Sequence, residues 1–250
     1  GESLREVAKV MARDHLYRDP SSLVTLLGLH DVPRFMGEPG ASVASLRHAF
    51  TFLLTARGTP LVYYGDEIAL PGGVDPDNRR DFPGGFPGDP RSAFEAAGRT
   101  ADEASVHDHV RALLKLRQEK GALRRGRTVN LHVADKTWAY ARVLDGQAAV
   151  VGINTGEKEQ ALDLDALPVG LAEGSRLRDR IGSLGEAVVE GARLRLVLPP
   201  GSSVRAGHET PNVPSPDEAS VTWPFPERRS PSQWAAAVRV AMLRSSVNRR

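Results

Sequence analysis

The spacing of apolar residues changes near residue 127, and this change divides the chain into two differently patterned parts. Up to that point, apolar residues recur at the i, i+3, i+4, i+7 spacing of amphipathic helices or gather in short unbroken runs. Beyond it, apolar and polar residues alternate, a pattern typical of half-buried strands. The sequence therefore predicts a part built from helices and strands, followed by a part built from strands alone.

Three helices are predicted in the first part. One follows Ser3 and Glu6, which have the spacing of a capping box, and a second follows Ser42, a favourable N-cap residue. The third starts near Ser105, and Gly58 is suited to the left-handed residue that ends the second helix. Their apolar stripes are Leu4, Val7, Ala8 and Met11; Val43, Leu46, Phe50, Leu53 and Leu54; and Val106, Val110, Leu113, Leu114 and Arg117.

Two short apolar runs, Leu23–Leu27 and Leu61–Tyr64, are predicted as strands. Unbroken apolar runs of this length are typical of parallel strands that are buried on both faces. With the second helix between them they form a βαβ unit, and Asp19–Ser22 forms a turn before the first strand. Residues 71–104 contain many Gly, Pro and Asp residues without periodicity, so they are predicted as a long loop.

The alternating part contains a hairpin. Asp145-Gly146 lies between the β-prone runs Thr137–Leu144 and Gln147–Asn154, which is among the strongest hairpin signals. Further short strands follow, and Pro199–Gly201 ends the last of them, so this part is predicted to be a small antiparallel β-domain. These strands are Gln160–Leu164, Arg176–Asp179, Glu186–Val189 and Ala192–Leu198.

The predicted boundaries are 1–120 for the helix-and-strand part, 121–206 for the β-domain and 207–250 for a tail. Pro, Ser, Glu and Arg dominate the tail, a composition that favours disorder. Within it, Trp234–Leu243 is apolar enough for one helix. The tail is unlike the β-domain in composition, and we interpret it as poorly ordered or extraneous.

The amino-acid composition excludes several classes of fold and site. With 40% hydrophobic and 26% charged residues, the 250-residue chain is suited to one or two globular domains. The absence of Cys excludes a disulfide framework and thiolate metal sites. No apolar run approaches the ~18 residues that span a bilayer, and a net charge of +2 gives no basic face. We expect no nucleic-acid or membrane partner, no cofactor and no metal, and leave the compartment open between a bacterial cytoplasm and secretion.

Three ordered segments carry the candidate chemistry: residues 27–35 (Leu-Gly-Leu-His-Asp-Val-Pro-Arg-Phe), Gly58–Glu67 and Asp75–Arg79. In this order and at this spacing they resemble the late part of the catalytic barrel in the α-amylase family of glycoside hydrolases. The first segment matches the family's His-Asp-x-x-Arg motif after its seventh barrel strand, and the second matches the eighth strand and its following loop. The Asp75–Asp81 loop is most similar to the branch of cyclomaltodextrinases and neopullulanases.

The resemblance implies a fold. Residues 1–120 would be an α/β fragment of a (β/α)8 barrel, with about two of its strands, and a small antiparallel β-sandwich domain would follow. The family's nucleophilic Asp and acid Glu belong to its fourth and fifth strands, so the resemblance implies that this chain begins after both. Two unclosed strands leave unpaired edges and apolar faces. We therefore expect copies of the chain to associate through the open barrel face.

The resemblance also implies residue roles. Asp31 and His30 match the family's catalytic positions, where Asp31 stabilises the oxocarbenium-like transition state and His30 hydrogen-bonds the same sugar. Asp75 and Arg79 match the pair that grips the next sugar unit, since a carboxylate and a guanidinium suit bidentate contact with hydroxyls. Arg34 is grouped with these substrate-binding residues, where it braces the loop or its carboxylate.

Other polar residues of these segments are expected to be structural. Glu67 matches a family Glu that fixes the last loop, although Asp66-Glu67 also has the spacing of a catalytic dyad. Tyr64 is assigned, with Tyr63, to packing at the site. Leu29 departs from the family pattern, which commonly has Asn or another small polar residue there, and this weakens a hydrogen bond near the first sugar site.

Three functions from different classes remain open. The first is the C-terminal part of an α-amylase-type hydrolase acting on α-glucans or maltooligosaccharides, without the family nucleophile and general acid. The second is a non-catalytic glucan-binding or assembly module that uses His30, Asp75 and Arg79. The third is a free-standing hydrolase with a site rebuilt from Asp31, Glu67 or Asp75. Turnover of maltooligosaccharides favours the first or third function, and binding without turnover favours the second.

Overall fold

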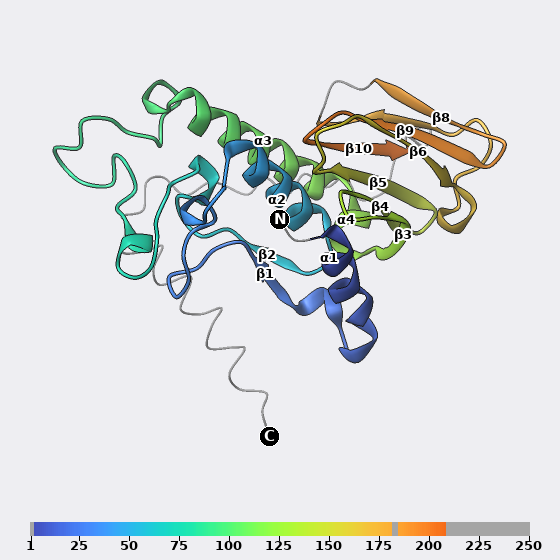
Figure 1. Ribbon diagram of the computed structural model, residues 1–250, viewed down its shortest axis with the longest axis horizontal. Helices are drawn as coiled ribbons and strands as arrows, with labels where there is room; N and C mark the ends of the chain where they lie inside the picture. The colour runs from blue at the N-terminus through green and yellow to red at the C-terminus, as the bar shows by residue number, and fades with distance from the viewer. Residues whose placement is uncertain (1–2, 182–184, 209–250) are drawn as a thin grey trace, which may run out of the picture.

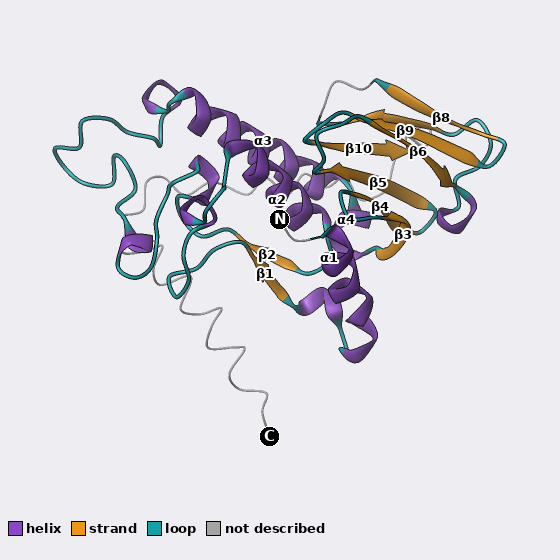
Figure 2. Ribbon diagram, viewed as in Figure 1, coloured by secondary structure: helices purple, strands orange, loops and turns teal. Residues whose placement is uncertain are grey.

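The computed structural model describes residues 3–181 and 185–208 of the chain. Figure 1 shows a helical part lying beside layered antiparallel strands, and Figure 2 shows a long loop that extends from the helical part, away from those strands. The predicted tail falls almost wholly outside the described residues, which end at residue 208. Within the described ranges, no helix combines the length and the apolar content that a bilayer crossing requires.

The first helix is capped differently from the prediction. The Ser3 hydroxyl accepts from the Arg5 N–H at 3.1 Å and donates to Asp135 Oδ1 at 2.6 Å, in place of the expected capping box with Glu6. The cap therefore ties the helix start to the β-domain. The α-helices are α1 (Leu4–Met11), α2 (Val43–Thr55), α3 (Ala101–Glu119) and the short α4 (Gly121–Arg125).

The second helix follows the prediction and the third begins earlier. α2 is capped by Ser42 in a capping box. α3 begins at Ala101 rather than near Ser105, because Thr100 and Glu103 form a capping box of their own. The loop-like composition upstream hides this signal in the sequence. Of the predicted α3 stripe, Val106, Val110 and Leu113 are buried, whereas Leu114 is 46% exposed.

Gly58 does not end α2, contrary to the prediction. The helix ends at Thr55, Ala56 is extended, and Gly58 lies at the entrance of the next strand with φ of +104°. A Cβ at this position would lie 2.6 Å from the Leu23 carbonyl oxygen. Glycine therefore allows the two strand entrances to approach each other closely.

Two short parallel strands, β1 (Val24–Leu26) and β2 (Thr59–Leu61), form a sheet with α2 between them in sequence. β1 agrees with its prediction. β2 starts earlier than the predicted Leu61–Tyr64, because the Thr59 N–H already donates to the Leu23 carbonyl at 2.9 Å. Tyr63 and Tyr64 consequently belong to the following loop.

The expectation that these strands are buried on both faces is wrong for the described residues. Leu27 and Val62 pack against the core formed by α2 and α3, so one side of the pair is covered. On β1, however, Val24 is 58% exposed and Leu26 is 40% exposed. The pair therefore has one packed side and one apolar side in contact with solvent.

The second part is an eight-stranded antiparallel arrangement in the order β3-β4-β5-β10-β7-β8-β9-β6. Asp145 and Gly146, with φ of +46° and +77°, close the β4–β5 hairpin as predicted. The strands are β3 (Arg127–Val133), β4 (Thr137–Leu144), β5 (Gln147–Asn154), β6 (Gln160–Asp165), β7 (Arg176–Asp179), β8 (Glu186–Glu190), β9 (Arg193–Leu198) and β10 (Ser202–His208).

The sequence pattern does not predict β10, although it occupies the middle of the sheet. It follows Pro199-Pro200-Gly201 and contains few apolar residues, so its alternation is weak. It pairs with β5 on one side and β7 on the other. Its place is therefore set by backbone pairing with strands distant in the sequence.

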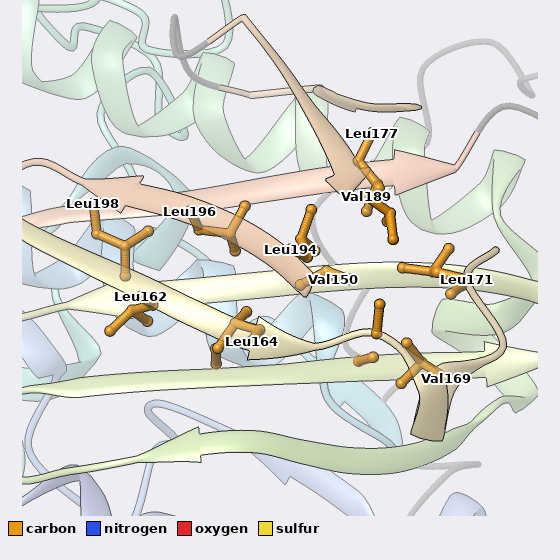
Figure 3. Packing of buried hydrophobic residues seen from close by; sticks show 14 residues of the cluster. Val150, Leu162, Leu164, Val169, Leu171, Leu177, Val189, Leu194, Leu196 and Leu198 are labelled. Carbon is orange, nitrogen blue, oxygen red and sulfur yellow. The ribbon is translucent and has the colours of Figure 1, made fainter. Parts of the chain in front are cut away.

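The core of the β-domain forms between two layers of strands. Figure 3 shows Leu162, Leu164, Leu194 and Leu196 of β6 and β9 turned toward Val150 of β5. All five side chains are buried. Burying a side chain of this size contributes roughly 1.5–3 kcal/mol, so this cluster stabilises the domain substantially.

The opposite face of β4 and β5 is covered by α1. Ala8 packs in one cluster with Trp138, Tyr140 and Val151, and the Leu4 N–H donates to the Asp135 carbonyl at 2.9 Å. Burial on both faces explains why β4 and β5 are the most continuously buried strands of the described sheet. The division of the chain at residues 120 and 206 stays a prediction.

A buried arginine connects several elements within the helical part. Arg117 of α3 donates through Nη1 to the carbonyl oxygens of Leu54 and Ala56, at 3.0 and 3.1 Å. The same side chain reaches the carbonyls of Leu123 at 2.9 Å and Gly58 at 2.7 Å. It therefore caps the C-terminus of α2 and fixes the approach to β2.

Candidate functional site

The candidate site forms where β1 and β2 end. Because the two strands are parallel, the segments that follow them, residues 28–37 and 63–70, emerge at the same edge of the sheet. Functional side chains of α/β barrels collect at this carboxyl edge. The loop containing residues 75–80 is bonded to both segments. The three segments that the sequence singled out therefore meet at one place.

Four of the predicted site residues form a line of charged and polar groups at the surface, in which only His30 is half-buried; we call this line the surface charge row: His30, Asp31, Arg79 and Asp75. His30 Nε2 lies 3.2 Å from Asp31 Oδ1, and the same oxygen lies 4.0 Å from Arg79 Nη2. Arg79 Nε donates to Asp75 Oδ1 at 2.5 Å, and this carboxylate raises the pKa of the Arg79 guanidinium. Exposed carboxylate oxygens and guanidinium hydrogens are thus presented together.

Arg34 lies behind the surface charge row and is fully buried. Its Nε donates to the Asn78 carbonyl at 2.8 Å, and its Nη1 donates to the Tyr64 carbonyl at 2.7 Å and to Asp66 Oδ1 at 2.9 Å. A buried side chain cannot touch a sugar, so Arg34 does not fit direct substrate binding. It braces three segments, and the carboxylate that it holds is that of Asp66, not Asp31.

Two tyrosines enclose the buried guanidinium. The Arg34 Cζ lies 4.5 Å from the ring centre of Tyr63 and 4.7 Å from that of Tyr64, distances that suit cation–π contact. The Tyr64 hydroxyl donates to the Arg80 carbonyl at 2.9 Å. Burial, more than any other cause, raises the pKa of Tyr63 to about 12. Tyr64 therefore connects the loop after β2 to the loop after Pro76.

Asn78 is a site residue that sequence reasoning missed. It is fully buried, and its side-chain amide donates to the carbonyls of His30 and Val32, both at 2.9 Å. The backbone around it is tightly packed, because a Cβ on Gly72 would lie 2.7 Å from the Asp77 carbonyl oxygen. Nothing in the sequence separates Asn78 from an ordinary polar loop residue, since its burial depends on contacts with residues more than forty positions away.

The adjacent carboxyl groups of Asp66 and Glu67 are not part of the surface charge row, because both are largely shielded from solvent. Asp66 is 3% exposed, and burial raises its pKa to about 6 against the opposing charge of Arg34. Burial also raises the pKa of Glu67, opposed by backbone N–H groups of Glu67 itself and of Gly65. Asp66 is therefore part of the support beneath the site through its contact with Arg34, and the structural role of Glu67 stays a prediction.

In the part of the chain that the structure describes, no three or more His, Cys, Asp or Glu side chains are grouped so that they could hold a metal ion. His109, for example, is directed to α2, where its Nε2 lies 2.9 Å from Thr51 Oγ1 and 3.0 Å from the Arg47 carbonyl. His107 lies beside Asp108 instead, at 3.4 Å. The two histidines therefore contact different residues.

Comparison with known proteins gives consistent relatives, although no family model matches the chain. Neopullulanase 2 of Thermoactinomyces vulgaris is 35% identical over 143 residues, and the cyclomaltodextrinase of Geobacillus thermopakistaniensis is 32% identical over 145 residues. Each match covers 56% of this chain and 22% of the relative. The chain thus spans about a fifth of the length of the curated relatives it matches.

A solved structure extends the similarity to the fold. The α-amylase of Geobacillus thermoleovorans, determined with acarbose, aligns at a TM-score of 0.68 and 28% identity over 84% of this chain and 44% of that one. The shared sequence and fold place this chain among relatives of the glycoside hydrolases. More narrowly, it is related to the α-amylase family, and its curated matches include the cyclomaltodextrinase and neopullulanase branch that the Asp75–Asp81 loop predicted.

Proposed function

We propose that this chain supplies the sugar-holding half of an α-amylase-type glycoside hydrolase site that acts on α-glucans or maltooligosaccharides. The observation that supports this most is the surface charge row at the carboxyl edge of β1 and β2. It presents two carboxylates within ion-pairing distance of one guanidinium, so their donors and acceptors can engage neighbouring sugar hydroxyls.

Asp31 is proposed as the transition-state stabiliser. Its side chain is 67% exposed, and its Oδ1 faces His30 at 3.2 Å. A carboxylate in this position favours the positive charge that develops at the anomeric carbon, while His30 binds the same sugar. The proposal assigns neither the nucleophile nor the general acid to a residue of this chain.

Asp75 and Arg79 are proposed to hold the next sugar unit, on a support made by buried residues. Arg34 and Asn78 fasten the loops that carry the surface charge row, and Glu67 and Tyr64 complete that support. A fixed support matters because a hydrolase site must hold its sugar close to one geometry. The parallel β1–β2 pair, with α2 as its crossover, supports the assignment of residues 1–120 to a barrel fragment.

We also propose that the solvent-facing side of β1 mediates self-association. Val24 and Leu26 expose apolar surface on a strand edge, a combination that favours pairing with another chain. The β-domain, proposed as residues 121–206, lies outside this contact.

Binding of acarbose and maltotriose to the full 250-residue chain tests the function, by isothermal titration calorimetry. Asp31→Asn is expected to weaken binding about tenfold or more, because an uncharged amide loses a charge-assisted contact. Asp163→Asn is the matched control: Asp163 is also 67% exposed and also faces an arginine, but it lies in the β-domain. Equal affinity in the wild type and Asp31→Asn would contradict the proposal.

An activity assay on maltooligosaccharides separates the alternatives. We expect little or no turnover, because a stabilising carboxylate neither attacks the anomeric carbon nor protonates the leaving oxygen. Binding without turnover fits the half-site and also a non-catalytic glucan-binding module. Turnover that Asp31→Asn abolishes favours a free-standing hydrolase built on Asp31 and Asp75. The burial of Glu67 disfavours its participation in such a site.

A further inference from the structure

A cleft lies at the opposite edge of the parallel strands. Its volume is about 390 Å3, and it is lined by Met11, Ala12 and Asp14, by the turn that precedes β1, by Arg57 just before β2, and by the first residues of β3. The surface charge row follows β1 and β2, whereas the lining residues before and within the turn precede β1, and Arg57 precedes β2. The remaining wall comes from the start of β3. The cleft is therefore separate from the candidate sugar site and lies against the β-domain.

One carboxylate, that of Asp14, faces this cleft, and its negative charge is already balanced by a neighbouring arginine. Arg57 donates to Asp14 Oδ1 through both Nε, at 2.8 Å, and Nη2, at 2.6 Å. The exposed Arg127 also lines the cleft, and its Nη2 donates to the Pro168 carbonyl rather than to a carboxylate. The charged residues of the lining thus leave a net positive charge.

A third guanidinium lies directly behind the wall. Arg142 of β4 is fully buried, and its Nη1 donates at 3.0 Å to the hydroxyl of Thr128, which lines the cleft. Its Nε reaches only the Ala122 carbonyl, at 3.4 Å, and its buried Nη2 has no hydrogen-bond partner among the described residues. Burial lowers the pKa of Arg142 to about 10, so it stays charged at neutral pH.

A buried cation without a bonded carboxylate is costly, and an anion nearby offsets that cost. Asp14 and Arg57 both influence the pKa of Arg142, which places the cleft within electrostatic range of the buried guanidinium. Because the charges of Asp14 and Arg57 oppose each other, they leave the charge of Arg142 largely uncompensated.

Two uncharged polar residues of the lining, Thr128 and Asn130, have hydrogen-bond donors to offer. The Thr128 oxygen accepts from Arg142, so its hydroxyl hydrogen is left to donate in another direction. The Asn130 carbonyl oxygen accepts from Trp138 Nε1 at 2.9 Å, so its amide hydrogens are what it can offer a ligand. A cleft with surplus donors and positive charge selects for a ligand rich in acceptors and negative charge.

We propose that this cleft binds a small anion of the phosphate class, held by Arg127, Thr128 and Asn130 and balanced by the buried Arg142. The volume is sufficient for a phosphorylated metabolite as well as for inorganic phosphate. The proposal does not depend on glucan binding, because the two sites lie at opposite ends of the strands.

Thermal unfolding of the full chain in increasing inorganic phosphate tests the site, with sodium chloride at matched ionic strength as the reference. Phosphate is expected to raise Tm along a saturating curve that chloride does not reproduce. Arg142→Met and Thr128→Val are expected to weaken the apparent phosphate affinity about tenfold. Arg127→Ala tests the rim without altering the core, and Arg195→Ala, an exposed arginine of β9, is its matched control.

The outcomes decide the proposal even if Arg142→Met does not fold. Loss of the phosphate effect in Thr128→Val and Arg127→Ala, with retention in Arg195→Ala, supports the site. An unsaturated effect that chloride reproduces, or equal affinity in the wild type and these two variants, overturns it. Glucose 6-phosphate distinguishes the source: tighter binding than phosphate, lost in the same variants, indicates a phosphorylated sugar, and equal or weaker binding indicates free phosphate.

Discussion

Arg34 and Asp66 form an ion pair at 2.9 Å in which the guanidinium is fully buried and the carboxylate nearly so. Removing one member of such a pair leaves a buried charge without compensation. We expect Arg34→Met to lower the free energy of unfolding by about 3–5 kcal/mol at pH 7.5, measured by urea denaturation. The double variant Arg34→Met/Asp66→Leu is expected to recover much of this loss, and Arg195→Ala is the exposed control. An Arg34→Met variant as stable as the wild type would contradict the role of the pair.

The stability contributed by Asp66 is expected to fall as pH rises. Its pKa is raised from 3.8 to about 6 in the folded chain, so between these values the folded state holds a proton that the unfolded state has lost. Stability due to Asp66 is therefore fully present below about pH 4 and is lost as pH rises through about 6. The change amounts to about 2–3 kcal/mol at most. Urea unfolding of the wild type and Asp66→Asn between pH 4 and 7 measures it: their difference should change with pH, and a constant difference would reject the assignment.

Asn78 is expected to affect both stability and sugar binding. Asn78→Ala removes two hydrogen bonds to the carbonyls of His30 and Val32, at a cost of about 1–3 kcal/mol in unfolding free energy. Asp31 lies between His30 and Val32 in the loop that Asn78 holds, so the affinity for acarbose should fall as well. Asn154→Ala is a matched control, since Asn154 is also fully buried and also donates to loop carbonyls, but in the β-domain. It should lose stability and keep acarbose affinity; an equal loss of affinity in both variants would indicate a general folding defect.

Self-association should depend on β1. Burial of apolar surface contributes about 25 cal/mol per Å2, so even a modest contact through Val24 and Leu26 favours an oligomer. Light scattering after size-exclusion chromatography is expected to show an oligomer for the wild type and a monomer for Leu26→Glu. Leu167→Glu, on an exposed leucine of the β-domain, should leave the oligomer intact. A wild-type monomer would end this proposal.

The parts of the fold that the sequence predicts are those with local causes. The Asp145-Gly146 hairpin follows from two adjacent residues that accept left-handed backbone conformations, and α2 follows from its own cap and stripe. β10 could not be predicted in this way, because its pairing with β5 and β7 is its main determinant. The same distinction explains the exposure of β1: an apolar run indicates a strand, but it does not indicate what covers the strand.

The candidate site also contains residues that the sequence predicts and residues that it does not. The motif segments that the sequence singled out bring Asp31 and Arg79 within 4.0 Å of each other. The positions of Arg34 and Asn78 beneath that surface were not readable from the sequence. A buried guanidinium or amide is recognised only from the carbonyls around it, and these come from separate loops. Their roles in sugar binding stay predictions.

The docking of α1 on the β-domain has a consequence for the order of folding during synthesis. Ser3 and Leu4 bond to Asp135, and Ala8 packs on Trp138, so the first helix rests on residues that leave the ribosome much later. An isolated helix of this length is marginal in water. The contacts between α1 and the β-domain therefore form only after the β4–β5 hairpin has been made, and α1 should be more open to protease in a nascent chain halted before that hairpin.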